Sequence, residues 1–205
     1  MPLVYQQNIN DTTKTGIWHI TETEDFFLEH VSVQREITHQ HKRLQHLAGR
    51  LLLKKLCPGF PVELIQIADT KKPFLPNELY HFSISHCRDY AALIVSKTNR
   101  VGVDIELQAN KIEKIIPKFL TSEECFLLPH NSIIKTATLF WSVKESIYKR
   151  CNKTGIDFKK QISIKQITGG VNEGIVSCIF NNETPLSVYY LWFNSYFLTW
   201  VATDY

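Results

Sequence analysis

Residues 100–106 read RVGVDIE, and this stretch lies at the middle of a chain of 205 residues. Read as a strand, its three branched apolar side chains share one face, while Gly102, Asp104 and Glu106 share the other. Strands favour β-branched and aromatic residues, so two neighbouring carboxylates need an explanation. Either that face is open to water, or a positive group lies against it.

The pattern before this strand predicts both helices and strands. Apolar residues recur every three or four positions from 37 to 57, which is typical of a helix, and Pro58 and Gly59 follow its end. Another helix start has Thr21 or Thr23 as its cap. The predicted strands of this half lie at residues 17–20, at 62–68 and on both sides of a turn at 86–89.

The pattern after RVGVDIE follows the same order. A short acidic helix begins at Thr121 or Ser122, and a long helix covers about residues 133–151. Four apolar segments then predict strands, with a hairpin turn at Asn194 and Ser195. The repeated order predicts an α+β fold, a pseudo-twofold pair of similar modules, each an antiparallel sheet packed with a long helix. The predicted modules are residues 1–102 and 103–205.

The composition indicates a globular chain, since 44% of its residues are hydrophobic and 12% are aromatic. No stretch approaches the ~20 apolar residues that a membrane helix needs, and the polar N-terminal segment lacks the apolar run of a signal peptide. The five cysteines are irregularly spaced without a CxxC pair, as in proteins of reducing compartments. We therefore expect a cytoplasmic protein that does not bind membranes.

Positive charge is concentrated locally in a chain whose net charge is only +3. Between residues 35 and 55, Glu36 is the single acid. The basic residues of this segment are Arg35, Lys42, Arg43, Arg50, Lys54 and Lys55, and Lys71 and Lys72 follow. A local basic cluster in a nearly balanced chain indicates an anion of limited size rather than a long polyanion.

The long helix carries two different faces in the segment LFWSVKESIYKR, residues 139–150. Its apolar stripe must face a core. Trp141, Glu145 and Lys149 recur at four-residue spacing on another face. Taken alone, Glu145 and Lys149 form an ordinary exposed pair. Together with Asp104 and Glu106, however, they provide the hard oxygen ligands and the positive charge of a magnesium-assisted phosphoryl site.

Four blocks of the chain resemble the 4′-phosphopantetheinyl transferases, of the larger kind that activates surfactin synthetase. The blocks are HFSISHCRDYAALIVS (81–96), RVGVDIE (100–106), FLTSEE (119–124) and FWSVKESIYK (140–149). The upstream segments KRLQHLAGRLLL (42–53) and KKPFL (71–75) are similar to further elements of that family. The resemblance extends from residue 17 to about residue 200, and the pairing of GVDIE with WSVKES is its most specific part.

The resemblance implies an enzyme made of two copies of a small α+β module, with the active site in the cleft between them. Such enzymes transfer the 4′-phosphopantetheine arm of coenzyme A to a serine of an apo acyl or peptidyl carrier protein, use Mg²⁺ and release adenosine 3′,5′-bisphosphate. Residues 1–102 would then supply a coenzyme A-binding helix and hairpin. Residues 103–205 would supply the metal-binding helix and sheet. A monomer that binds no nucleic acid is expected.

The resemblance also implies roles for individual residues. Asp104, Glu106 and Glu145 correspond to the metal ligands, and Lys149 to a lysine that contacts the pyrophosphate. Glu123 and Glu124 are candidates for the base that takes the proton of the carrier serine. Of the two, Glu124 aligns better with the corresponding acid of the family.

Further correspondences concern coenzyme A. Ser85 and His86 correspond to a pair that contacts its phosphates, and Lys72 to a lysine of its pocket. Arg43 or Arg50 would contact the 3′-phosphate. Cys87 stands where the family usually has a second serine, so that hydroxyl contact is in doubt.

A rival interpretation is a catalytically degenerate relative that binds a nucleotide or RNA. The basic helix at 37–57 offers phosphate contacts for it. The aromatic residues, however, lie mainly in strands with apolar neighbours, as in a core rather than a base-stacking platform. All three predicted metal ligands and Lys149 are present, and a degenerate copy would not need them.

Overall fold

The computed structural model describes residues 2–32, 36–70, 72–76, 78–151 and 153–204. Arg35 and Lys71 of the predicted basic group lie outside these ranges. The chain divides into two compact units, Met1–Val101 with Asp204–Tyr205 (unit 1) and Gly102–Thr203 (unit 2). Within the described ranges, no helix combines the length and hydropathy that a membrane crossing requires.

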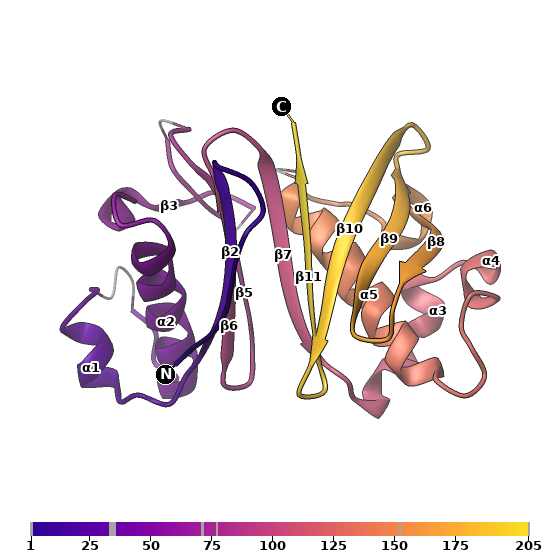
Figure 1. The fold of residues 1–205 in the computed structure, drawn as a ribbon, viewed down its shortest axis with the longest axis horizontal. Coiled ribbons are helices and arrows are strands. Elements are labelled where there is room, and N and C mark those ends of the chain that lie inside the picture. Colours follow the sequence, from indigo (N-terminus) through magenta and orange to yellow (C-terminus); the bar gives the residue numbers. More distant parts are fainter. Residues whose placement is uncertain (1, 33–35, 71, 77, 152, 205) are drawn as a thin grey trace. The chain divides into compact units, whose positions relative to one another are not determined.

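Unit 1 is a four-stranded antiparallel sheet with a long helix along one face (Figure 1). The strands, in spatial order, are β1 (Leu3–Asn8), β2 (Thr13–His19), β6 (Tyr90–Ser96) and β5 (His81–Cys87). The helix α2 (Gln40–Leu56) packs on β2, β5 and β6, and the short α1 (Glu24–Leu28) packs on α2. A 3₁₀ turn, η1 (Val62–Leu64), and the short pair β3 (Gln66–Ile67) and β4 (Pro73–Phe74) connect α2 to β5.

The core of unit 1 forms where the apolar side of α2 meets the sheet. Leu47, Leu51 and Leu52 are buried there against apolar residues of β2 and β6. Gly49 allows close contact with β5, because a Cβ at this position would lie 2.9 Å from Ile84 Cγ2. The sequence of α2 therefore fixes which side of the helix faces the sheet.

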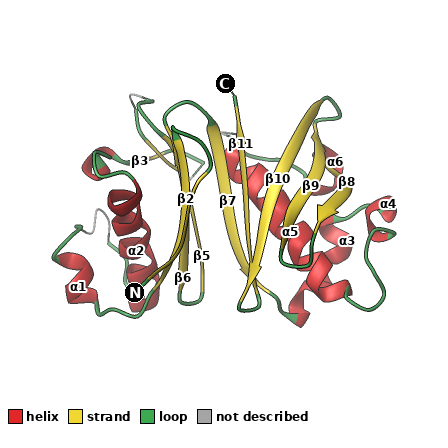
Figure 2. Ribbon diagram, viewed as in Figure 1, coloured by secondary structure: helices red, strands yellow, loops and turns green. Residues whose placement is uncertain are grey.

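Unit 2 is a five-stranded antiparallel sheet packed against α5 (Ile133–Arg150). The strands, in spatial order, are β7 (Arg100–Leu107), β11 (Tyr196–Thr203), β10 (Thr184–Phe193), β9 (Glu173–Phe180) and β8 (Ile162–Gly169). Short helical segments, visible in Figure 2, connect these elements. They are η2 (Asn110–Ile115), α3 (Ile116–Phe119), α4 (Ser122–Cys125) and α6 (Phe158–Gln161).

The predicted α+β class with antiparallel sheets is confirmed, and so is the hairpin turn between β10 and β11. Asn194 and Ser195 both have positive φ, 46° and 68°, as two-residue hairpin turns require. The predicted strand at 62–68 is wrong for most of its length, because its first three residues form η1 and only two of its residues pair with β4. The two sheets have four and five strands, and the pseudo-twofold relation stays a prediction.

Candidate phosphoryl-transfer site

Asp104 lies in β7 and is only 4% exposed. The explanation that this strand face is open to water therefore does not hold for Asp104. Ser142 Oγ donates to Asp104 Oδ2 at 2.9 Å, and Lys149 Nζ donates to Asp104 Oδ1 at 2.7 Å. Both donors come from α5. The positive group that the sequence requires opposite Asp104 is therefore Lys149.

The contacts of Asp104 also fix which side of α5 faces β7. Ser142 and Lys149 both reach Asp104, and Glu145 lies between them at spacings of three and four residues. Residues so spaced share one face of a helix. Glu145, which is half-buried, therefore lies on the side of α5 that carries the two donors to Asp104.

Glu106 is the more accessible carboxylate of β7. Its side chain is 21% exposed, and Lys111 Nζ lies 3.6 Å from its Oε1. Burial raises the pKa of Glu106, and the negative charge of Asp104 raises it further, whereas Lys111 and Lys149 act in the opposite direction. Two like charges thus lie close together on one strand face, as a cation site would need.

The raised pKa of Glu106 leads to a prediction about stability. Around the raised pKa, folded Glu106 keeps a proton that the unfolded chain has lost, so the stability of the metal-free protein falls as the pH rises through this range. We expect Glu106→Gln to be more stable than the wild type at neutral pH and similar below about pH 4. Urea unfolding in the presence of a chelator, at neutral pH and below about pH 4, measures the free energy of unfolding of the variant and the wild type. A variant less stable at neutral pH would contradict it.

Gly102 sets the distance between β7 and α5. A Cβ on Gly102 would lie 2.0 Å from the carbonyl oxygen of Ser146 and 2.7 Å from the backbone nitrogen of Arg150. These are backbone atoms of α5, so no side-chain rotation can relieve the contact. The absent side chain thus lets α5 approach the strand that carries Asp104.

We expect Gly102→Ala to lower the free energy of unfolding by about 1–3 kcal/mol, because α5 must move away from β7. Gly59→Ala is the matched control, since a Cβ there meets nothing within 4 Å. Urea unfolding compares the two. Equal stability of both variants would show that α5 adapts to the methyl group without cost.

The carboxylates of this site suit Mg²⁺ in their chemistry, because hard oxygen atoms are its preferred ligands. Asp104 and Glu106 are adjacent on one face, and Glu145 lies on the helix side that meets Asp104. In the described part of the chain, no group of three His, Cys, Asp or Glu side chains is placed closely enough to hold a metal ion. The three-carboxylate metal site therefore stays a prediction.

Glu124, the preferred candidate for the base, is 2% exposed and lies in a buried network. It forms a capping box with Thr121 at the start of α4. Its Oε2 accepts from Lys144 Nζ at 2.8 Å, and its Oε1 accepts from the backbone N–H of Ile164 at 2.7 Å. This placement fits a structural role rather than that of a base, which must reach the carrier serine. Glu123 is exposed at the first turn of the same short helix.

Unit 1 contains the residues predicted to bind coenzyme A. Ser85 and His86 are neighbours in β5, so they point to opposite faces of the sheet; Ser85 is buried and His86 is exposed. The turn that follows them is fastened to α2, because Gln45 Nε2 donates to the carbonyl oxygen of Arg88 at 2.8 Å. The hairpin and α2 thus form one locally fixed structure.

The two arginines of α2 differ in their surroundings. Arg43 is held by Glu24 of α1: its Nε and Nη2 donate to the two carboxylate oxygens, and its Nη1 donates to the carbonyl oxygen of Ile37 at 2.8 Å. The ion pair raises the pKa of Arg43 and lowers that of Glu24. Arg50 is 5% exposed, and its Nη1 lies 3.1 Å from His46 Nδ1. Lys72 is half-buried beside β4.

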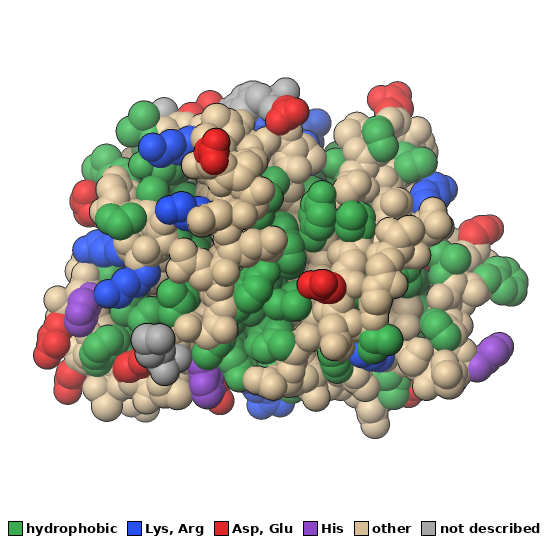
Figure 3. Space-filling model, viewed as in Figure 1, with side chains coloured by type: hydrophobic (Ala, Val, Ile, Leu, Met, Phe, Trp, Pro, Cys, Tyr) green, Lys and Arg blue, Asp and Glu red, His purple; other side chains and the backbone are tan. Residues whose placement is uncertain are grey.

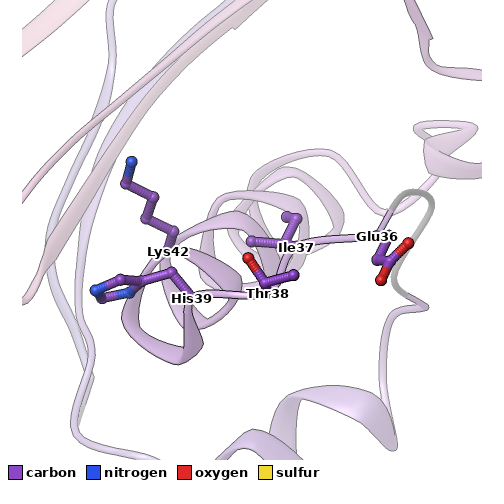
Figure 4. A pocket seen from close by; sticks show the side chains of 5 residues that line it. All are labelled: Glu36, Ile37, Thr38, His39 and Lys42. Atoms are coloured by element: carbon purple, nitrogen blue, oxygen red, sulfur yellow. The ribbon is translucent and has the colours of Figure 1, made fainter.

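A shallow cavity of about 490 Å³ lies where the chain enters α2. Its lining residues are Glu36, Ile37, Thr38, His39 and Lys42. Figure 4 shows His39 and Lys42 extending to one end of the cavity and Glu36 lying at the other end. The end formed by His39 and Lys42 offers nitrogen donors to an anion.

Sequence reasoning missed three buried polar residues that surround the site. Ser142 and Thr199 form the contacts behind Asp104, and Lys144 holds Glu124. A signal for Lys144 was available, because it falls on the apolar stripe of α5, four residues after Phe140. The spacing Thr121-x-x-Glu124 is likewise typical of a capping box. No local pattern distinguishes Ser142 or Thr199.

Comparison with known families covers the part of the chain that contains Asp104, Glu106, Glu145 and Lys149. Residues 100–201, the half of the chain that contains β7, α5 and the C-terminal strands, match the model of the 4′-phosphopantetheinyl transferase superfamily. The chain belongs to this superfamily.

Curated relatives include proteins described as enterobactin synthase component D. The Salmonella typhi protein is 33% identical over 132 residues, which is 60% of this chain and 56% of the relative. The Salmonella austin protein is 33% identical over 134 residues, 60% of this chain and 55% of the relative. The Salmonella typhimurium protein is 31% identical over 116 residues, which is 53% of this chain and 47% of the relative. The chain thus spans about half the length of these curated relatives.

Proposed function

We propose that this protein transfers the 4′-phosphopantetheine arm of coenzyme A to a serine hydroxyl of an apo carrier protein in an Mg²⁺-dependent reaction. Membership of the superfamily supports the reaction class. The observation that carries the proposal is the contact of Lys149 with Asp104 beside Glu106. It brings carboxylates that suit a cation next to a lysine that suits a phosphate.

Asp104, Glu106 and Glu145 are the proposed holders of the cation. When bound, Mg²⁺ would neutralise negative charge on the pyrophosphate oxygens of coenzyme A. Lys149 is 24% exposed and carries a compact ammonium group on a flexible four-carbon stem. We propose that it exchanges part of its contact with Asp104 for the pyrophosphate and stabilises the charge that develops there.

The proposed step forms one bond and breaks one. The serine oxygen of the carrier forms a bond to the phosphorus attached to the pantetheine arm, and the P–O bond to the adenosine nucleotide breaks. Adenosine 3′,5′-bisphosphate leaves with the electron pair of that bond. Because Glu124 is buried in its network, we assign the acceptance of the serine proton to Glu145, which is half-buried on the helix face of Lys149.

The nucleotide end of coenzyme A is proposed to bind unit 1. Arg43 is held by Glu24, so it is the less suitable of the two arginines for the 3′-phosphate. His39 and Lys42 at the cavity before α2 supply donors that are not tied to Glu24. Lys72 and the Ser85–His86 pair remain our proposed contacts to the other phosphates.

Mass spectrometry of the carrier tests the proposal directly. The protein is incubated with coenzyme A, Mg²⁺ and a panel of apo acyl and peptidyl carrier proteins. We expect at least one carrier to gain the mass of the phosphopantetheine arm, and the gain to disappear in a chelator. Absence of the added mass on every carrier, with a known transferase loading the same panel, would refute the proposal.

The face drawn in Figure 3 gives no support to the rival RNA-binding interpretation. On the face drawn in Figure 3, acidic side chains are interspersed with Lys and Arg over unit 1. A protein that follows a nucleic-acid backbone needs a more continuous basic surface than this face provides. We therefore advance no second function.

A further inference from the structure

Three hydroxyl side chains are buried together directly behind Asp104. Ser142 and Ser146 lie one turn apart on α5, and Thr199 lies on β11. All three are 0% exposed. Ser146 Oγ lies 2.6 Å from Thr199 Oγ1, Thr199 Oγ1 lies 2.9 Å from Ser142 Oγ, and Ser142 Oγ lies 2.9 Å from Asp104 Oδ2. These contacts form a continuous chain that ends on the carboxylate.

The carboxylate determines the direction of the hydrogen bonds. An ionised carboxylate only accepts, so the single proton of Ser142 must point to Asp104. The Ser142 oxygen can then only accept from Thr199, whose hydroxyl also has the carbonyl oxygen of Ser142 within 2.9 Å. Ser146 in turn donates to Thr199, through Oγ1 or through its carbonyl oxygen at 3.0 Å. When Ser146 donates to Thr199 Oγ1 and Thr199 donates to Ser142 Oγ, the three hydroxyl groups are aligned and strengthen the hydrogen bond to Asp104.

The two carboxylate oxygens of Asp104 have different hydrogen-bond partners. Oδ2 is held by Ser142 in the interior, while Oδ1 contacts the partly exposed Lys149. A buried hydrogen bond on one oxygen fixes the rotation of the carboxylate, so Oδ1 stays directed to the side of Lys149.

We propose that Ser142, Thr199 and Ser146 are positioning residues that hold Asp104 with Oδ1 turned toward the cation, and thereby set the affinity of the site for a divalent cation. This proposal rests on the proposed function for the identity of the site. It adds residues that act on the cation only through Asp104.

Binding of Mn²⁺ in the presence of coenzyme A, followed by the electron paramagnetic resonance of free Mn²⁺, tests the proposal without measuring activity. We expect Ser142→Ala to weaken Mn²⁺ binding by about tenfold or more, as is usual when a residue that orients a metal ligand is lost. Thr199→Val, which keeps the shape but removes the hydroxyl, should weaken binding as well. Thr199→Ser keeps the hydroxyl and should bind Mn²⁺ much more tightly than Thr199→Val.

The matched control is Thr138→Val. Thr138 is 1% exposed on the same helix, and its hydroxyl donates only to the carbonyl oxygen of Ile134 among the described contacts. Loss of the Thr138 hydroxyl group should change the free energy of unfolding, measured in urea, but not the affinity of the protein for Mn²⁺. If Ser142→Ala fails to fold, the two Thr199 variants decide the question.

Wild-type affinity in both Ser142→Ala and Thr199→Val would overturn the proposal, as would the absence of Mn²⁺ binding in the wild type. Equal weakening by Thr199→Ser and Thr199→Val would also overturn it. The outcome is separable from that of the proposed function. A wild type that loads no carrier refutes the function, whereas unchanged Mn²⁺ affinity in the variants refutes only the positioning roles.

Discussion

Asp104→Asn is expected to reduce transfer of the phosphopantetheine arm to a carrier by about 100- to 1,000-fold while leaving the protein folded. Asparagine has the size of aspartate and still accepts a hydrogen bond from Ser142, so the strand and the helix keep their contact. What disappears is the negative charge beside Glu106 and Lys149. A divalent cation would lose a charged ligand, and Lys149 would lose the carboxylate that holds it in place.

The stability of this variant is expected to fall by about 1–3 kcal/mol, because the amide nitrogen that replaces Oδ1 is a donor facing the donor Lys149 Nζ, and the aspartate side of this pair is buried. Urea unfolding measures the stability, and the mass gain of the carrier over time measures the rate of transfer. Glu173→Gln is the matched control, since it neutralises an exposed carboxylate on β9. Near-normal transfer by Asp104→Asn would show that Asp104 is not part of the reacting site.

The sequence predicts those parts of the fold that depend on local patterns. The 3.6-residue periodicity placed α5 to within a residue of its observed end at Arg150, and the alternation in RVGVDIE placed Asp104 and Glu106 on one face. The turn at Asn194 and Ser195 follows from residues that tolerate positive φ. The strand at 62–68 failed because a short apolar run does not distinguish a strand from a 3₁₀ turn.

The environment of each site residue depends on contacts far apart in the sequence. Arg43 has the residue type of a phosphate ligand, and Glu24, nineteen residues earlier, accepts hydrogen bonds from its guanidinium group. Glu124 has the residue type of a base, and the fold places its two oxygens where they accept from Lys144 and from the backbone of β8. Residue type and spacing identify groups that are able to do chemistry. Burial and partners, which only the folded chain provides, decide whether they are accessible for it.

Lys144→Met is expected to lower the free energy of unfolding by about 3–5 kcal/mol. The Lys144 side chain is 0% exposed and donates to Glu124 Oε2 at 2.8 Å, to the carbonyl oxygen of Phe119 at 2.8 Å and to that of Phe158 at 3.0 Å. Its ammonium group thus joins α5 to three other segments. Burial lowers the pKa of Lys144, and the hydrogen bond that Lys144 donates to Glu124 opposes that change.

Methionine fills nearly the same volume, so little cavity forms, and the predicted loss comes from the groups left behind. The Glu124 carboxylate would remain buried with its negative charge uncompensated, and two buried carbonyl oxygens would lose their donor. Urea unfolding followed by fluorescence measures the change in the free energy of unfolding. Lys160→Met serves as the control, because Lys160 and its partner Asp157 are both exposed, so its removal should cost much less.

A second variant separates the charge from the packing. If the uncompensated carboxylate causes the loss, neutralising it in Lys144→Met/Glu124→Gln should recover part of the stability, since glutamine still accepts a hydrogen bond from the N–H of Ile164. A double variant as unstable as the sum of the two single variants would mean that the two side chains contribute independently. Retention of wild-type stability in Lys144→Met alone would show that the buried ion pair contributes no net stability to unit 2.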